Sequence, residues 1–120
     1  MKIAVPSQGT GLDAGVDSRF GRAEFFIVVE SETNKFEVVE NGQNLNAAQG
    51  AGIQSARNVI NAQADILITH HVGPKAFAAL SAGGVKVFTG STGTVKEAVE
   101  QFKRGELEEA ANADVEGHWI

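Results

Sequence analysis

The sequence predicts one three-layer α/β domain with the element order βββαβαβα. Three short strand patterns open the chain, and apolar strand runs then alternate with helix patterns. The first three strands form a meander, which makes the second strand antiparallel, and the later strand–helix units wind right-handed. We therefore expect a five-stranded mixed sheet of order 3-2-1-4-5, with the domain over residues 1–105 and a C-terminal tail over 106–120.

The first half of the chain supplies the three-stranded meander. Lys2–Val5 is a short apolar strand that we expect to end at Pro6. The eighteen residues Ser7–Glu24 contain four glycines and no helical periodicity, and a loop of that length in a compact domain is usually functional. Phe25–Glu30 and Lys35–Glu40 have strand patterns separated by four polar residues, a spacing that predicts a hairpin.

Helices and short strands alternate in the second half. Asn46 and Gln49 resemble a capping box ahead of the first helix, and Thr94 and Glu97 form another ahead of the last. Pro74 suits the first position of the middle helix, where its missing N–H costs nothing. The expected elements are a helix over 47–62, a strand over 66–68, a helix over 75–82, a strand over 85–88 and a helix over 95–104.

Composition narrows the function classes. The net charge of −5 argues against a nucleic-acid partner, which would need a basic face. The chain has no cysteine, which excludes disulfides, thiolate catalysis and clusters held by protein thiolates. No apolar run approaches the roughly 20 residues of a membrane span, and the first strand starts too early for a signal peptide. We therefore expect a cytoplasmic protein without a membrane partner.

Two of the three histidines lie between the buried strand Ile66–Ile68 and the helix that starts near Lys75. Open α/β sheets bind ligands at such strand ends, and a helix N-terminus favours an anion. An imidazole can also ligate a metal, so His70, His71 and the backbone of Gly73 are candidates for ligand binding. Adjacent side chains of an extended backbone point to opposite sides, so we expect only one histidine to face the site.

The long loop contains a second candidate segment, Arg19-Phe20-Gly21-Arg22. Its two guanidiniums can hold an anionic ligand by charge-assisted hydrogen bonds. The alternative is that Phe20 anchors the loop in the core while the arginines pair with Asp13 and Asp17. The earlier stretch Gly9–Ala14 formally matches a dinucleotide fingerprint, but the residues after it are too rich in glycine to start the required helix.

Two further candidates lie nearer the C-terminal end. The loop Thr89–Thr94 precedes the last helix and can cradle a phosphate or another anion through Ser91 and Thr92, although it lacks the Lys-Ser/Thr ending of a P-loop. His118 is the third possible metal ligand and lies in the tail beside Trp119. The alternative for this tail segment is an anchor made by hydrophobic burial alone.

Four stretches of the chain together resemble the dinitrogenase iron–molybdenum cofactor biosynthesis family, which includes NifX/NafY-like proteins and the C-terminal domain of NifB. The stretches are Ser18–Ala23, Val72–Ala76, Gly83–Val87 and Gly93–Val99, and they follow the order of the family over nearly the whole chain. The resemblance implies a ribonuclease-H-like motif. It does not imply ribonuclease H chemistry, because the strand Ile3–Val5 carries no carboxylate for two-metal catalysis.

The resemblance further implies a non-catalytic carrier of an anionic metal–sulfur cofactor of the iron–molybdenum type, or of its precursor. Such a cargo is bound transiently, with metal-cofactor donor and acceptor proteins as partners, and the carrier is a monomer or a weak homodimer. Many family members have a histidine just before the Phe-Gly pair, where this chain has Arg19, so a possible ligand is replaced by a charge. With few direct bonds to a metal, loose binding would suit a protein that passes its cargo on.

Two alternatives belong to other classes of function. The first is a regulatory or interaction module that docks through the acidic tail segment Glu106–Glu116. The second is an enzyme that acts on a phosphorylated or nucleotide-like small molecule at the same end of the sheet. The enzyme would show turnover without any metal–sulfur cargo, and the module would lose its partner when the tail is deleted.

Overall fold

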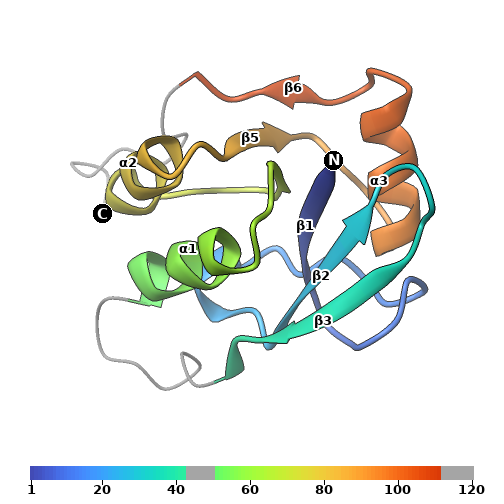
Figure 1. The fold of residues 1–120 in the computed structure, drawn as a ribbon, viewed down its shortest axis with the longest axis horizontal. Coiled ribbons are helices and arrows are strands. Elements are labelled where there is room, and N and C mark those ends of the chain that lie inside the picture. Colours follow the sequence, from blue (N-terminus) through green and yellow to red (C-terminus); the bar gives the residue numbers. More distant parts are fainter. Residues whose placement is uncertain (43–50, 112–120) are drawn as a thin grey trace.

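The computed structural model describes residues 1–42 and 51–111, which form a mixed β-sheet with helices on both faces (Figure 1). The strands are β1 (Lys2–Ser7), β2 (Phe25–Glu30), β3 (Phe36–Glu40), β4 (Ile66–Ile68), β5 (Lys86–Thr89) and β6 (Glu108–Glu109). The helices are the 3₁₀ turn η1 (Phe20–Arg22), α1 (Ala51–Asn61), α2 (Pro74–Ala82) and α3 (Val95–Lys103). The predicted start of the first helix at Ala47 lies outside the described residues.

The strand order in the sheet is β3-β2-β1-β4-β5-β6. Strand β2 is antiparallel to both β1 and β3, whereas β4 runs parallel to β1 and to β5. The predicted order is therefore confirmed for five strands, and the predicted number is wrong by one. Strand β6 pairs antiparallel with β5, with Phe88 opposite Glu109. Two exposed glutamates carry no apolar alternation, so only this long-range pairing makes them a strand.

Strand β1 continues through Pro6 to Ser7, so the expected end at Pro6 is also wrong. The carbonyl of Pro6 accepts a hydrogen bond of 2.9 Å from Asp17 N. The N and the C=O of one strand residue point to the same edge of the strand. Because the C=O of Pro6 points toward the loop, its nitrogen, which has no hydrogen, also points toward the loop and away from β2. Proline is tolerated here because it removes no donor from the β1–β2 ladder.

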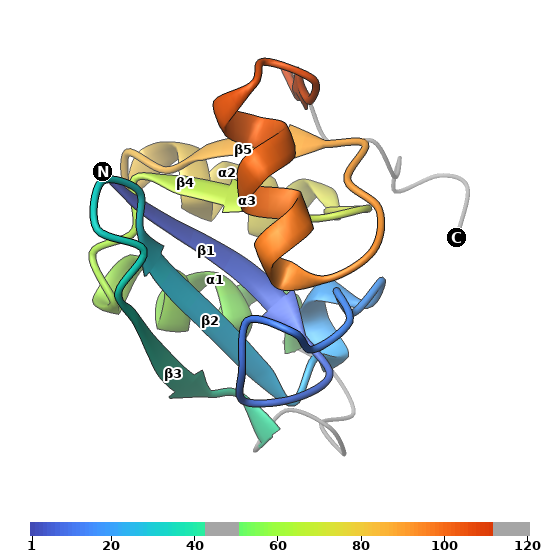
Figure 2. The same cartoon turned by 90° about the vertical axis from the view of Figure 1, so that its right-hand side faces the viewer.

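Two apolar cores fill the spaces between the three layers. Helices α1 and α2 cover one face of the sheet and α3 covers the other, as Figure 2 shows in side view. Side chains alternate along the central strands, so Leu67 belongs to the core under α1 and α2, while Ile66 and Ile68 belong to the core under α3. Burial on both faces explains why this strand is an unbroken apolar run.

Backbone hydrogen bonds hold the loop between β1 and β2 in place. Gln8 N donates to Gly15 O at 3.0 Å, and Val16 N donates to Gly93 O at 3.1 Å. The loop then makes the η1 turn, where Phe20 is 4% exposed and its ring centroid lies 5.5 Å from that of Phe26. The predicted long loop is therefore an ordered part of the fold.

None of the helices in residues 1–42 and 51–111 has both the length and the apolarity that crossing a membrane would require.

Candidate functional site

The carboxyl ends of the parallel strands β1, β4 and β5 meet at one edge of the sheet. Three segments leave from this edge: the loop 8–24 after β1, the segment 69–73 after β4 and the loop 90–94 after β5. The first and third segments touch, because Val95 N donates to Ala14 O at 2.9 Å and Lys96 N donates to Leu12 O at 3.0 Å. In Figure 2 the loop after β1 lies against the start of α3. The candidate segments Gly9–Ala14, Arg19–Arg22, His70–Gly73 and Gly90–Thr94 therefore all follow strands at this edge of the sheet.

Three polar side-chain atoms at this end are buried without a hydrogen-bond partner: Thr69 Oγ1, His70 Nδ1 and Ser91 Oγ. In the part of the chain that the structure describes, they are the buried side-chain polar atoms left unpaired. Each such group costs roughly 1–3 kcal/mol of stability. Native proteins keep few of them, and those they keep call for an explanation such as a binding role. Their location after β4 and β5 marks this edge as the candidate site.

The two adjacent histidines differ in exposure. His70 is half-buried with its Nδ1 atom fully covered, whereas His71 is exposed. The next residue, Val72, is 3% exposed and belongs to the core under α1 and α2. The buried valine fixes the backbone that carries both histidines. His70 is therefore the one of the pair whose ring lies partly inside the protein.

Helix α2 begins directly after the histidines. Gly73 is its N-cap, with φ −72° and ψ 166°, and gives no side-chain cap; Pro74 occupies the first turn as predicted. A Cβ on Gly73 would have no atom within 4 Å, so open space adjoins the helix start. The N–H groups of Lys75 and Ala76 thus belong to a helix N-terminus that no side chain caps, and such a terminus favours negative charge.

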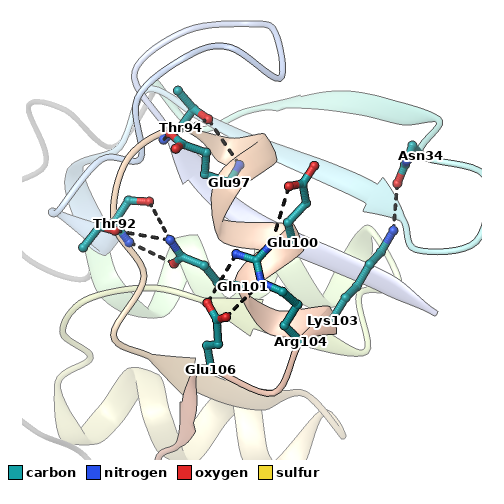
Figure 3. Close-up of polar contacts among 9 residues, drawn as sticks. All are labelled: Asn34, Thr92, Thr94, Glu97, Glu100, Gln101, Lys103, Arg104 and Glu106. Carbon is teal, nitrogen blue, oxygen red and sulfur yellow. Dashed lines mark hydrogen bonds and ion pairs between the residues drawn. The ribbon is translucent and has the colours of Figure 1, made fainter.

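The loop between β5 and α3 is fixed by helix α3. The predicted capping box is present: Glu97 N donates to Thr94 Oγ1 at 3.2 Å, and Thr94 N donates to Glu97 Oε1 at 3.0 Å (Figure 3). Gly93 has φ +87°, and a Cβ there would collide with the Glu97 carboxylate. Thr92 is bound by Gln101, so its N–H group is already engaged. Ser91 lies just ahead of this braced segment.

The segment Arg19–Arg22 is built around a buried carboxylate. Asp17 is 2% exposed and accepts hydrogen bonds from Arg19 N at 2.9 Å, Nε at 3.1 Å and Nη2 at 3.2 Å. The hydrogen bond to Asp17 raises the pKa of the exposed Arg19 guanidinium. Phe20 lies in the core, and Gly21 lets η1 approach α1, because a Cβ there would be 3.2 Å from Gly52 N. Arg22 is half-buried at the end of η1.

Among the described residues, no group of three or more His, Cys, Asp or Glu side chains is arranged to hold a metal ion. His118, the third histidine named from the sequence, lies outside the described residues. A metal bound at this end would therefore take one imidazole and few other protein ligands from the described part of the chain.

Sequence reasoning named His70 and Ser91 at this site but missed Thr69. Thr69 is 0% exposed and directly continues the apolar run Ile66–Ile68. A polar residue at the end of an otherwise apolar buried strand is the signal that could have identified it. The sequence indicates Asp17 only as a possible partner of the arginines; in the structure it is buried and holds Arg19 in place.

Comparisons with known proteins find similarity over most of the chain. Residues 1–105 match the family described as "Dinitrogenase iron-molybdenum cofactor". The apo form of the orange protein from Desulfovibrio gigas is 43% identical, with 95% of this chain and 96% of that chain covered and a TM-score of 0.91. A NifB-like protein from Thermotoga is 40% identical, with 97% and 98% covered and a TM-score of 0.82. An uncharacterized protein of Methanocaldococcus jannaschii is 32% identical over 111 residues, which is 90% of each chain.

Proposed function

Because the chain belongs to the dinitrogenase iron–molybdenum cofactor family, we propose that it is a non-catalytic carrier of an anionic metal–sulfur cofactor of the iron–molybdenum type, or of its precursor. The observation that carries the proposal is the unpartnered, buried Nδ1 atom of His70, which lies three residues before the uncapped start of α2 at Gly73. A structural histidine of this kind would be expected to have a hydrogen-bond partner. A ligand histidine needs a free lone pair before its metal arrives.

Local electrostatics support a negatively charged cargo. Helix α2 begins at the site without a side-chain cap, so the positive end of its dipole faces this end of the sheet. Arg19 and Arg22 add positive charge, although Asp17 offsets that of Arg19. A chain with a net charge of −5 therefore presents the uncapped N-terminus of α2 and two arginines where the cargo is proposed to bind.

The residues available for metal binding favour loose attachment and transfer. The chain has no cysteine, so no thiolate can hold an iron–sulfur unit tightly. With one imidazole, backbone N–H groups and guanidiniums as contacts, the cargo can be released to an acceptor protein and received from a donor protein. The orange protein, the 43% identical neighbour, is described in its apo form, which implies a ligand-bound form of that relative. We place the carrier in the cytoplasm, where such a transfer would occur.

An anaerobic titration tests the proposal. The purified protein and a His70→Ala/His71→Ala double variant are mixed with an iron–molybdenum–sulfur cluster and desalted, and the metal retained per chain is measured together with the visible absorption. We expect stoichiometric retention by the wild type and loss by the variant. Circular dichroism checks that the variant is folded. Absence of retention by the wild type would rule out the carrier function.

A further inference from the structure

We propose that the hydroxyl groups of Thr69 and Ser91 form a subsite for a small tetrahedral oxyanion at the carboxyl ends of β4 and β5. The inference rests on the function proposed above for placing the ligand at this end of the sheet. The subsite adds a class of ligand to that proposal: a small oxyanion, in addition to the metal–sulfur cargo.

The two hydroxyls differ from other buried polar groups at the same end. Thr69 is 0% and Ser91 1% exposed, and neither oxygen has a hydrogen-bond partner. Ser7 is equally buried at the end of β1, yet its hydroxyl donates to Gly9 O at 2.8 Å. Asp17 is also buried and is fully engaged by Arg19. The fold thus satisfies Ser7 and Asp17 and leaves the two hydroxyls, together with His70 Nδ1, without a partner.

The two hydroxyls follow the ends of neighbouring strands. Thr69 N donates to Phe88 O at 3.0 Å, so Thr69 lies alongside the last residues of β5. Ser91 follows the end of β5 by two residues, after Gly90, whose φ of +102° turns the chain. Two donors that follow paired strands suit two oxygens of one small ion.

The chemistry of the surroundings favours an oxyanion over a cation. Hydroxyl groups make short, strong hydrogen bonds to charged oxygen acceptors. Helix α2 begins five residues after Thr69, and its N-terminus has no side-chain cap, so its positive end favours a negative charge here. Asp17, the buried carboxylate of the adjoining loop, is already neutralised by Arg19. An incoming cation would therefore find no free buried carboxylate in the described part of the site.

An unfilled subsite makes a specific prediction about stability. Replacing an unpaired buried hydroxyl by an apolar group of the same shape is neutral or stabilising, whereas removing a hydroxyl with a structural role destabilises. Thr69→Val and Ser91→Ala should therefore keep or raise the melting temperature of the protein without ligand. An oxyanion should raise the melting temperature of the same variants less than that of the wild type. Such a gain in stability with a loss of binding is common for substitutions at a binding site.

The experiment follows thermal unfolding of the full chain in molybdate, phosphate or sulfate, each against sodium chloride of equal ionic strength. We expect an oxyanion to raise the melting temperature of the wild type in a concentration-dependent way. The apparent affinity should fall by about tenfold or more in Thr69→Val and in Ser91→Ala. Thr69→Ser keeps the hydroxyl and should keep most of the response, and Ser81→Ala, which removes an exposed hydroxyl from α2, is the matched control.

Two results would overturn the subsite. One is that no oxyanion stabilises the wild type beyond chloride; the other is that both variants respond like the wild type. A lower melting temperature of unliganded Thr69→Val, with Thr69→Ser unchanged, would assign the hydroxyl a structural role instead. Cluster retention measured on the same variants separates the two proposals. A cluster retained without any oxyanion effect contradicts the subsite alone, and an oxyanion effect without cluster retention contradicts the carrier alone.

Discussion

The side chain of Gln101 on α3 binds Thr92 in the β5–α3 loop through both ends of its amide. Thr92 N donates to Gln101 Oε1 at 3.2 Å, and Gln101 Nε2 donates to Thr92 O at 3.4 Å and to Thr92 Oγ1 at 3.2 Å (Figure 3). A helix residue nine positions away thus braces the loop that carries Ser91. The shape of the candidate site therefore depends on a side chain that lies on α3 rather than in the loop.

Gln101→Ala should loosen this loop. We expect cargo retention after desalting to fall several-fold, while the free energy of unfolding changes by about 1 kcal/mol or less, because the lost hydrogen bonds are exposed to water. Urea titration and metal analysis measure the two effects. Glu100→Ala, at the preceding exposed position, is the control and should retain cargo like the wild type. Equal retention by both variants would show that the brace does not matter for binding.

A buried polar network around Asn41 should contribute to the stability of the fold. Asn41 is 0% exposed; its Nδ2 donates to Ala23 O at 2.8 Å, and its Oδ1 accepts from Asn58 Nδ2 at 2.6 Å. Asn41→Ala leaves these partners unsatisfied, so we expect a loss of roughly 1–3 kcal/mol. Urea unfolding measures it, with Asn61→Ala at the exposed end of α1 as the control. If the free energy of unfolding falls by the same amount in both variants, the buried network contributes no more to stability than an exposed side chain does.

Two glycines should separate binding from stability. A Cβ at Gly73 meets open space, whereas one at Gly83 would lie 2.8 Å from Ile60 Cδ1. Gly73→Ala should therefore keep the stability of the wild type within about 0.5 kcal/mol and lower cargo retention, because the methyl group enters the space beside α2. Gly83→Ala should lose stability through overpacking and keep retention per folded chain. Metal analysis and urea unfolding of both variants check this, and a reversed pattern would place the cargo elsewhere.

The pair Arg104–Glu106 gives a pH-dependent contribution to stability. The hydrogen bond from Arg104 Nε, at 2.9 Å, lowers the pKa of Glu106 below its usual 4.5. A carboxyl with a lowered pKa in the folded state adds stability that is present above pH 4.5 and is lost as the pH falls through the lowered pKa. The effect is small because both side chains are exposed. Urea midpoints between pH 6 and pH 3 should fall less steeply for Glu106→Gln than for the wild type; parallel curves would contradict the assignment.

Local patterns were enough to predict most of the fold. The strands Phe25–Glu30 and Ile66–Ile68 have the predicted bounds, because an apolar run between polar residues can be buried in few ways. Strand β6 could not be predicted, since Glu108 and Glu109 become a strand only by pairing with the edge of β5. Pro6 stays in β1 because the loop, and not β2, lies on the side of its missing N–H.

The candidate site was predictable only in outline. His70 and Ser91 stand at strand ends, which the order of elements already places at one edge of the sheet. The lack of a partner for Thr69 and the brace from Gln101 depend on which side chains meet after folding. Spacing along the chain cannot give that information, because hydrogen-bond satisfaction is a property of the tertiary structure.

The most direct test of the carrier function compares the two histidines separately. His70→Ala and His71→Ala are loaded with the iron–molybdenum–sulfur cluster under anaerobic conditions and desalted, and molybdenum and iron are counted per chain. Because His70 has the buried, unpartnered Nδ1 atom, we expect the His70→Ala variant to retain at least about tenfold less metal per chain than the wild type. The His71→Ala variant should retain metal like the wild type. Full retention by His70→Ala would contradict the proposed site.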